Sequence, residues 1–264
     1  MVTAMNETPA PSHAQAAQPL LQAMQLTRRF GGLAAVNQVS VSLHRGEVHG
    51  VIGTNGAGKS TLINMLSGEL AASSGTIRLR GEDITAWSQP KRARAGVGRS
   101  YQRTTIYPEF SVFENARLSA QAAQQRAWAV WQTARHCAHS TGIAREALAA
   151  AGLADKADHT AGARSHGGKR QLEIAMCLAT RPQVLLLDEP LAGMGAEETE
   201  RMLALLEALK RDHAVLLVEH DMDAVFRIAD RITVMVNGEV IASDTPDHIR
   251  SNPQVRVAYL GEGH

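Results

Sequence analysis

The chain alternates between short, unbroken apolar runs and longer segments whose apolar residues recur at helical spacing. The runs 184–187 and 214–218 contain no polar residue, which is typical of parallel strands buried on both faces. The segment before the first run keeps helical spacing until Pro182 ends the pattern. Its apolar residues are Leu172, Ala175, Met176 and Ala179. Strands that alternate with helices in this way predict an α/β fold.

The first part of the chain is richer in strand patterns. We expect strands near 22–28, 38–44 and 47–53, followed by a helix that runs to about Leu66 and is capped by Gly68. The α/β fold therefore begins with several strands before its first long helix.

Two further segments carry hairpin signals. Residues 76–79 continue into Gly81-Glu82, and residues 234–236 turn through Asn237-Gly238 into 240–241. The second signal is the stronger, because Asn-Gly is a favoured pair for a two-residue hairpin turn. Antiparallel strands are therefore expected beside the parallel ones.

Residues between 115 and 163 are alanine-rich and polar, unlike the rest of the chain. Trp128 and Trp131 lie three residues apart there, which is typical of side chains that fill a helix core. We expect a helical subdomain inserted into the α/β core. The expected organisation is a flexible tail over 1–20, the core over 21–114 and 164–250, the helical subdomain over 115–163, and a C-terminal tail over 251–264.

The strand expected to end near residue 53 leads directly into a glycine-rich loop that fits GxxxxGK[ST]. Glycines lack a Cβ, so consecutive backbone N–H groups can turn inward around phosphate oxygens. A helix that begins near Gly58 adds its positive end, Lys59 reaches the β- and γ-phosphates, and the Ser60 hydroxyl is a ligand for Mg²⁺. The residues of this predicted nucleoside triphosphate site are Gly53, Thr54, Asn55, Gly56, Ala57, Gly58, Lys59, Ser60 and Thr61. A P-loop alone does not separate kinases, GTPases, motors and transporters.

The two unbroken apolar runs end in polar side chains, at the strand ends where ligands bind in open α/β sheets. Asp188 and Glu189 follow the first run. We expect Asp188 to hold Mg²⁺ through water and Glu189 to orient and polarise the attacking water. His220 follows the second run, which would put it beside the γ-phosphate as a hydrogen-bond donor. A lone histidine is usually structural, so this expectation depends on its place after a buried strand.

The predicted helix that ends at Pro182 has an N-terminus that could bind an anion, as the helix after the P-loop does. Ser165, His166, Gly167 and Gly168 stand at its beginning, where free backbone N–H groups favour a negatively charged ligand. Of these, Ser165, Gly167 and Gly168 are the expected nucleotide contacts.

Together these segments resemble the Walker A, signature, Walker B and switch motifs of ABC transporter nucleotide-binding subunits. The resemblance extends from about Gln25 to Gly261. It implies an ABC ATPase fold with a mixed sheet core, an antiparallel β subdomain and an inserted helical subdomain. It also implies that Phe30 stacks on adenine and that Gln102, in the Q-loop, contacts Mg²⁺ and the permease. A single aromatic near a strand is also common in protein cores, which is the alternative for Phe30.

The resemblance further implies the assembly and the division of labour. Family members bind ATP and Mg²⁺ and work as head-to-tail dimers, so the signature of one subunit acts on nucleotide held by the other. Two integral-membrane permease subunits, a second ATPase subunit and, indirectly, an extracytoplasmic solute-binding protein are the implied partners. The chain would lie peripherally at the cytoplasmic face of the cytoplasmic membrane. The implied catalytic residues are Glu189, His220, Lys59 and Gln102, and the implied metal-binding residues are Ser60, Gln102 and Asp188.

Finer details resemble one branch, the branched-chain amino-acid importers. These details are the segments 29–33 and 219–222, Asn252-Pro253, and 259–261. Importers of urea and of short amides have similar sequences, and the ATPase of lipopolysaccharide exporters shares several features. A soluble ABC ATPase that acts on ribosomes or DNA would usually have paired ATPase domains or a long coiled-coil insertion, and a P-loop kinase would lack the signature and the switch histidine.

Four positions depart from the family pattern. Arg164 and Gly168 stand where the signature usually has leucine and glutamine or glutamate, and Thr54 replaces a usual proline. An arginine in place of a buried leucine needs a polar exit or a carboxylate. Gly195 stands where aspartate or asparagine often links the two sites of a dimer. We expect a weaker composite site and a distinct partner ATPase.

Composition narrows the class of protein further. The chain has 264 residues, 44% of them hydrophobic and 20% charged, with a net charge of +1. No apolar run reaches the roughly 18 residues of a membrane span, and the Ala-, Gln- and Pro-rich opening differs from a signal peptide. The near-zero net charge argues against broad nucleic-acid binding, and the basic run of Lys91, Arg92 and Arg94 is expected to be a solvated surface.

The two cysteines, Cys137 and Cys177, are too few for a disulfide framework. His136 and His139 lie beside Cys137, yet no second cluster completes the four ligands that zinc requires. We therefore expect helix-surface polarity at this cluster rather than a zinc site.

Overall fold

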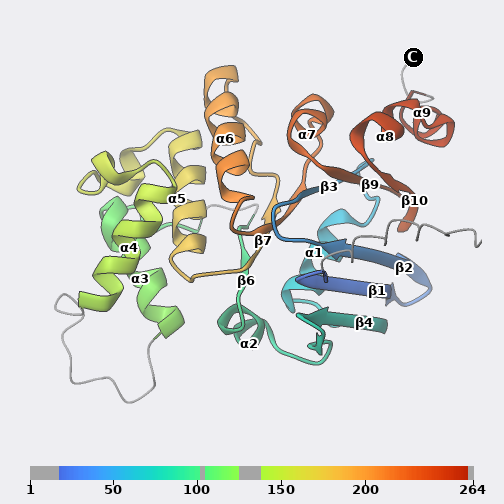
Figure 1. Ribbon diagram of the computed structural model, residues 1–264, viewed down its shortest axis with the longest axis horizontal. Coiled ribbons are helices and arrows are strands. Elements are labelled where there is room, and N and C mark those ends of the chain that lie inside the picture. Colours follow the sequence, from blue (N-terminus) through green and yellow to red (C-terminus); the bar gives the residue numbers. More distant parts are fainter. Residues whose placement is uncertain (1–17, 102–104, 125–137, 261–264) are drawn as a thin grey trace, which may run out of the picture.

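The computed structural model describes residues 18–101, 105–124 and 138–260, arranged around two sheets (Figure 1). The larger sheet has six strands in the order β10-β9-β3-β8-β7-β6, and the smaller has four in the order β2-β1-β4-β5. All neighbours in the larger sheet are parallel except β9 and β10, and the smaller sheet is antiparallel. The strands are β1 (Leu21–Phe30), β2 (Leu33–Leu43), β3 (Val48–Gly53), β4 (Ser74–Leu79), β5 (Glu82–Asp83), β6 (Val97–Arg99), β7 (Val184–Asp188), β8 (Ala214–Val218), β9 (Arg231–Val236) and β10 (Glu239–Asp244). The predicted mixed sheet and antiparallel β subdomain are confirmed.

The helices form separate groups around the sheets. In Figure 1, α3, α4 and α5 lie together at one end of the molecule, while α1 lies between the two sheets. The helices are α1 (Lys59–Ser67), α2 (Gln89–Arg94), α3 (Val112–Gln124), α4 (Ala138–Ala150), α5 (His166–Leu178), α6 (Ala196–Leu209), α7 (Met222–Ile228), α8 (Pro246–Ser251) and α9 (Pro253–Leu260), with short 3-10 turns at Ala154–Lys156 and Ala161–Ala163. The helices α3 and α4 belong to the segment where the sequence predicts an inserted helical subdomain.

The side chains of the unbroken apolar runs are divided between two hydrophobic cores, one on each face of the larger sheet. Leu185 and Leu187 of β7 join the core that includes α3, α4 and α5. Val184 and Leu186 of the same strand join the core that includes α1 and the smaller sheet. Because successive side chains of a strand point to opposite faces, a strand covered on both sides must be apolar at every position.

The turns follow the residues that the sequence provides for them. Asn237 and Gly238 have φ of 49° and 84° between the antiparallel strands β9 and β10, as a two-residue hairpin turn requires. Gly68 caps α1 with φ of 84°, and its backbone N–H donates to Met65 O. Both predictions are confirmed.

Two expectations about the chain surface are wrong. Arg92 is not part of a solvated patch, because its side chain is only 2% exposed and reaches inward to backbone carbonyl groups. The segment from residue 251 is not simply a tail, because residues 253–260 form α9 and the Val255 side chain is buried in the core. The local sequence of a short basic or terminal segment does not predict such contacts, because the residues that it contacts are distant in sequence.

Several predictions concern residues outside the described ranges. These are most of the N-terminal tail, Gln102, the pair Trp128 and Trp131, and His136 with Cys137. Cys177 is described and is a buried free thiol, whose pKa is raised to about 12 by burial. In the described part of the chain, none of the helices has both the length and the apolar character needed to cross a bilayer.

Candidate nucleotide site

Three predicted motifs meet at one edge of the larger sheet. The strands β3, β8 and β7 are parallel neighbours, so their carboxyl ends lie at the same edge. The P-loop follows β3, Asp188 ends β7 and is followed by Glu189, and His220 comes two residues after β8 ends. The sheet order therefore brings together side chains that are up to 161 positions apart, from Lys59 to His220.

The glycines of the P-loop are required by conformation and by close packing. Gly58 has φ of 98°, and a Cβ there would lie 2.3 Å from Ala35 O. A Cβ at Gly53 would lie 2.3 Å from Met235 O. Gly56 has φ of 81° and is exposed, with open space around a built Cβ. The loop is thus tightly enclosed at both ends while its middle faces outward.

The side chains that the sequence predicts to bind phosphate and metal stand at the start of α1. Lys59 Nζ lies inside the loop and donates to Gly53 O at 2.6 Å and to Thr54 O at 3.1 Å. Burial lowers the pKa of Lys59, while the charges of Glu189 and Asp188 oppose this shift. The remaining predicted loop residues differ in exposure: Asn55 and Ser60 are exposed, Thr54 and Thr61 half-buried and Ala57 buried.

The Asp188 carboxylate fits a role at a metal ion. Its Oδ1 atom is buried and has no hydrogen-bond partner among the described residues, and its Oδ2 lies 3.7 Å from an Arg99 guanidinium nitrogen. Burial raises the pKa of Asp188, which Arg99 opposes and the charge of Glu189 reinforces. A buried oxygen without a donor is what a metal ion or its bound water satisfies. The described residues contain no preformed group of three His, Cys, Asp or Glu side chains, so Asp188 and Ser60 would need ATP oxygens and water to complete the shell.

We expect Asp188→Asn to raise the melting temperature by a few degrees at pH 8 without nucleotide or metal. Because folding raises the pKa of Asp188, its contribution to stability falls as pH rises from the unfolded-state pKa through the folded-state pKa. The gain should shrink as pH falls toward the ordinary Asp pKa of 3.8. Thermal unfolding of both proteins in EDTA from pH 5 to 8 measures this difference. Equal melting temperatures across that range would contradict it.

Glu189 has an unusual backbone conformation. Its φ is 49°, which is uncommon for a residue other than glycine. Its backbone N–H donates to Val218 O at 2.8 Å, and Pro190 follows and restricts it further. A strained residue that neighbouring elements hold in place is typical of a functional site.

The His220 side chain is 61% exposed, and its Nδ1 lies 3.7 Å from Glu219 Oε2. Glu219 is fully buried, and its carboxylate accepts hydrogen bonds from the backbone N–H groups of Leu191 at 2.7 Å and His220 at 3.2 Å. Burial raises the pKa of Glu219 despite these bonds. Glu219 thus joins the loop after β7 to the loop after β8. No role is expected of Glu219 from the sequence pattern above, although its place directly after a buried strand is a signal.

The signature segment lies at the start of α5, where Ser165 is the N-cap and accepts from the Gly168 backbone N–H. Ser165 Oγ donates to Glu198 Oε1 at 2.7 Å, and His166 Nε2 is 3.0 Å from Ala192 O. Among the described residues, the side chains of the signature segment therefore bond to α6 and to the loop after β7. None of them bonds to the P-loop of the same chain.

Two departures from the signature pattern are coupled in space. A Cβ on Gly168 would lie 3.0 Å from Arg164 Nε and 3.1 Å from another nitrogen of the same guanidinium. Arg164 also lines a cleft of about 240 Å³ with Asp155. The pKa of the Asp155 carboxyl is lowered by its hydrogen bond to Lys156 and also by the charge of Arg164. Glycine at the fifth position therefore makes room for the arginine at the first. The guanidinium reaches the polar cleft, while its buried Nε has no hydrogen-bond partner among the described residues.

The signature helix also holds the ends of the Q-loop. Arg170 donates to Tyr101 O at 2.6 Å, and Glu173 Oε1 accepts from the Thr105 backbone N–H at 2.8 Å. The two side chains are paired with each other at 2.9 Å. The predicted residue Gln102 itself lies outside the described ranges, but Tyr101 and Thr105, on either side of residues 102–104, are both bonded to side chains of α5. The sequence pattern does not predict these bonds of Arg170 and Glu173 to Tyr101 and Thr105.

Phe30 is 48% exposed at the end of β1, so it is not the core residue that the alternative reading proposed. Arg28 lies over its ring at 4.7 Å. The hairpin partner β2 contacts the P-loop through Ala35 O. The part of the ring that is exposed and not covered by Arg28 is consistent with the expected stacking on a planar group near the P-loop.

The fold and this site define a P-loop ATPase of the ABC type. The ABC transporter family matches residues 36–192, and the C-terminal pattern described as branched-chain amino acid ATP-binding cassette transporter matches residues 239–264. The chain belongs to the ABC transporter family.

Relatives match nearly the whole chain. The high-affinity branched-chain amino acid transport ATP-binding protein BraF of Pseudomonas aeruginosa is 39% identical over 92% of this chain and 98% of its own. The corresponding protein LivG of Escherichia coli K12 is 40% identical over 93% and 99%. Among solved structures, a nucleotide-free ATP-binding cassette from an ABC transporter has a TM-score of 0.83 and 29% identity, with 93% of this chain and 100% of that chain covered.

Proposed function

We propose that this chain is the ATP-binding and hydrolysing subunit of an importer for branched-chain or related amino acids, or for urea or short amides. The observation that supports it most is the meeting of Lys59, Asp188-Glu189 and His220 at one sheet edge. The names of the relatives and the C-terminal match favour the amino-acid branch over a lipopolysaccharide exporter.

In this mechanism the P-loop amides and Lys59 bind the phosphates, and Phe30 stacks on adenine. Ser60, Asp188 and Gln102 would hold Mg²⁺, and the ion would supply charge neutralisation on the phosphate oxygens. Glu189 accepts hydrogen bonding from the attacking water and polarises it, while His220 donates to the γ-phosphate. The His220 side chain is mostly exposed, as contact with a bound nucleotide requires.

In the working assembly, Ser165, Gly167 and Gly168 face the γ-phosphate held by a second ATPase subunit. Gly195 is the N-cap of α6, with nothing within 4 Å of a built Cβ, and it contributes no side chain to the link between sites. We propose that the composite site is weak and that the partner is a distinct ATPase. Tight ATP-dependent homodimers of isolated Glu189→Gln protein, measured by sedimentation, would contradict this.

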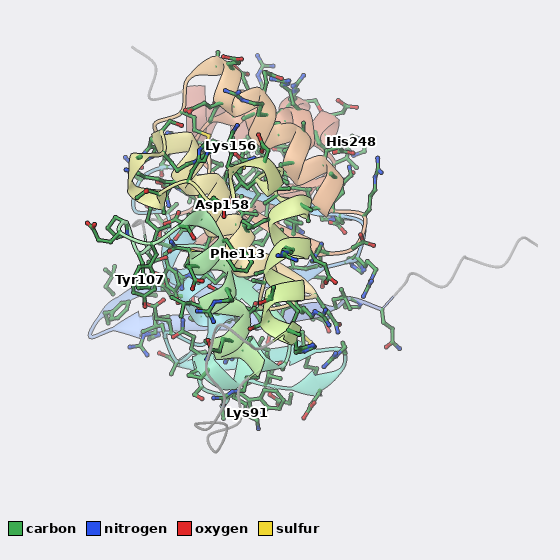
Figure 2. All side chains as sticks on the ribbon, turned by 90° about the vertical axis from the view of Figure 1, so that its left-hand side faces the viewer. Lys91, Tyr107, Phe113, Lys156, Asp158 and His248 are labelled. Carbon is green, nitrogen blue, oxygen red and sulfur yellow. The ribbon has the colours of Figure 1, made fainter. Side chains whose placement is uncertain are left out.

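A rigid aromatic pair supports permease docking beside the Q-loop. Tyr107 and Phe110 are stacked at 5.6 Å between ring centroids and are 54% and 45% exposed. The buried Asn115 side chain bonds both the N–H and the carbonyl of Tyr107, at 2.7 and 3.0 Å. Figure 2 shows Tyr107 at the outer edge of the face formed by α3 and α4. Exposed aromatic side chains on a fixed backbone are typical of a protein contact.

Purification from the native membrane in mild detergent, with mass spectrometry of the bound proteins, tests this function. We expect two permeases and a second ATPase at the cytoplasmic face, and a captured solute-binding protein would identify the solute. A single type of exporter permease would favour the lipopolysaccharide branch. Recovery with ribosomes or DNA, and with no membrane protein, would overturn the transport function.

A further inference from the structure

The N-terminus of α5 already holds a carboxylate from the same chain. Ser165 Oγ donates to Glu198 Oε1 at 2.7 Å. A Cβ on Gly167 would lie 2.6 Å from the carboxyl carbon of Glu198 and 2.7 and 2.8 Å from its oxygens. The carboxylate therefore lies directly against the glycine, and Gly167 is buried in consequence.

The position of this carboxylate is specific. Glu198 stands in the first turn of α6 beside Glu197, yet Glu197 is exposed and its closest cation, Arg201, is 3.9 Å away. Glu198 is only partly exposed and lines the cleft that also contains Arg164. The Ser165 hydroxyl and the start of α5 at Gly167, with the Arg164 guanidinium nearby, form a binding position for an anion that has several oxygens. We call this position the seat.

A terminal phosphate group matches the same seat. Like a carboxylate, it presents more than one acceptor oxygen and negative charge to the Ser165 hydroxyl and the helix start. Both groups cannot lie against Gly167 at once, because the carboxylate already contacts it. They would also repel each other as like charges.

We propose that Glu198 occupies the γ-phosphate seat of the signature motif and must be displaced by the partner-held nucleotide before two subunits close. This inference rests on the proposed function, in which Ser165 and Gly167 act on a partner's ATP. ADP brings no third phosphate to replace the carboxylate. Glu198 is therefore a specificity-determining residue that makes closure depend on the γ-phosphate.

A phosphate titration of the full-length, isotope-labelled protein saturated with Mg-ADP tests this. Backbone amide resonances of Gly167 and Gly168 report the seat, while those of Gly56 and Gly58 report the P-loop. In Glu198→Ala, inorganic phosphate should shift the Gly167 and Gly168 resonances at about tenfold lower concentration than in the parent, the factor expected for losing one charge-assisted competitor.

Two variants provide the controls. Glu198→Gln keeps an oxygen for Ser165 but no charge, so its midpoint should lie between those of the parent and Glu198→Ala. Glu197→Ala should titrate like the parent. Equal midpoints for Glu198→Ala and the parent, or no response of Gly167 in either protein, would overturn the inference. A P-loop that does not respond to Mg-ADP in the parent would instead refute the proposed function.

Discussion

Glu189→Gln is expected to lower ATP turnover by a factor of about 100 or more while leaving ATP binding intact. The loss is the magnitude typical of removing a general base or water-orienting carboxylate. Glutamine keeps the shape of the side chain and tolerates the same φ of 49° about as well, so the backbone after β7 should not change. Phosphate release and equilibrium nucleotide binding, measured on protein purified with its associated subunits, separate the two effects.

The matched control is Glu146→Gln, an exposed carboxylate on α4 that pairs with Arg181. It should hydrolyse ATP like the parent. If Glu189→Gln also did so, Glu189 would not be the group that activates water. If Glu189→Gln lost ATP binding as well, its role would be to maintain the loop rather than to act in the chemical step.

Arg92→Ala is expected to reduce the free energy of unfolding by about 3 kcal/mol, because it removes a charged donor from several buried acceptors. The guanidinium donates to Met65 O at 2.7 Å and Leu66 O at 2.9 Å, which are carbonyls of the last turn of α1. It also bonds Thr85 O and Trp87 O at 2.9 and 3.1 Å. Burial lowers the pKa of Arg92 to about 10, so the group still carries its charge at neutral pH.

Urea unfolding at pH 7 measures this effect. Arg94→Ala is the control, because Arg94 is exposed on the same short helix α2, and it should change stability by no more than about 0.5 kcal/mol. Equal unfolding midpoints for Arg92→Ala and the parent would show that water replaces the lost donors. A large loss in Arg94→Ala would place the effect in α2 as a whole.

The parts of the site that the sequence predicted are those whose chemistry lies next to a local pattern. The P-loop and Asp188-Glu189 directly follow apolar runs, and His220 comes two residues after another. Parallel strands bring such positions to one edge. The glycines of the P-loop were informative because the backbone there requires them. Their identity depends on local conformation and on a few close contacts, both of which a motif records.

The missed parts depend on long side chains whose partners are remote. Arg170 reaches a carbonyl 69 positions away, and Arg92 reaches one 27 positions away. A basic residue in a helix has the same local pattern whether its side chain is solvated or buried. Glu198 likewise reads as an ordinary acidic residue in a first helical turn, and only the fold brings it to Gly167.

The bonds that join α5 to both sides of the Q-loop couple the positions of these two segments. Tyr101 and Thr105, which flank residues 102–104, are bonded to Arg170 and Glu173, and these two side chains stand five and eight residues after Ser165 in the sequence. If a permease contacts Tyr107 as proposed, a displacement of this segment would reach the helix that carries Ser165 through the bonds of Tyr101 and Thr105 to α5. Permease movement and nucleotide binding would then be coupled through the position of α5.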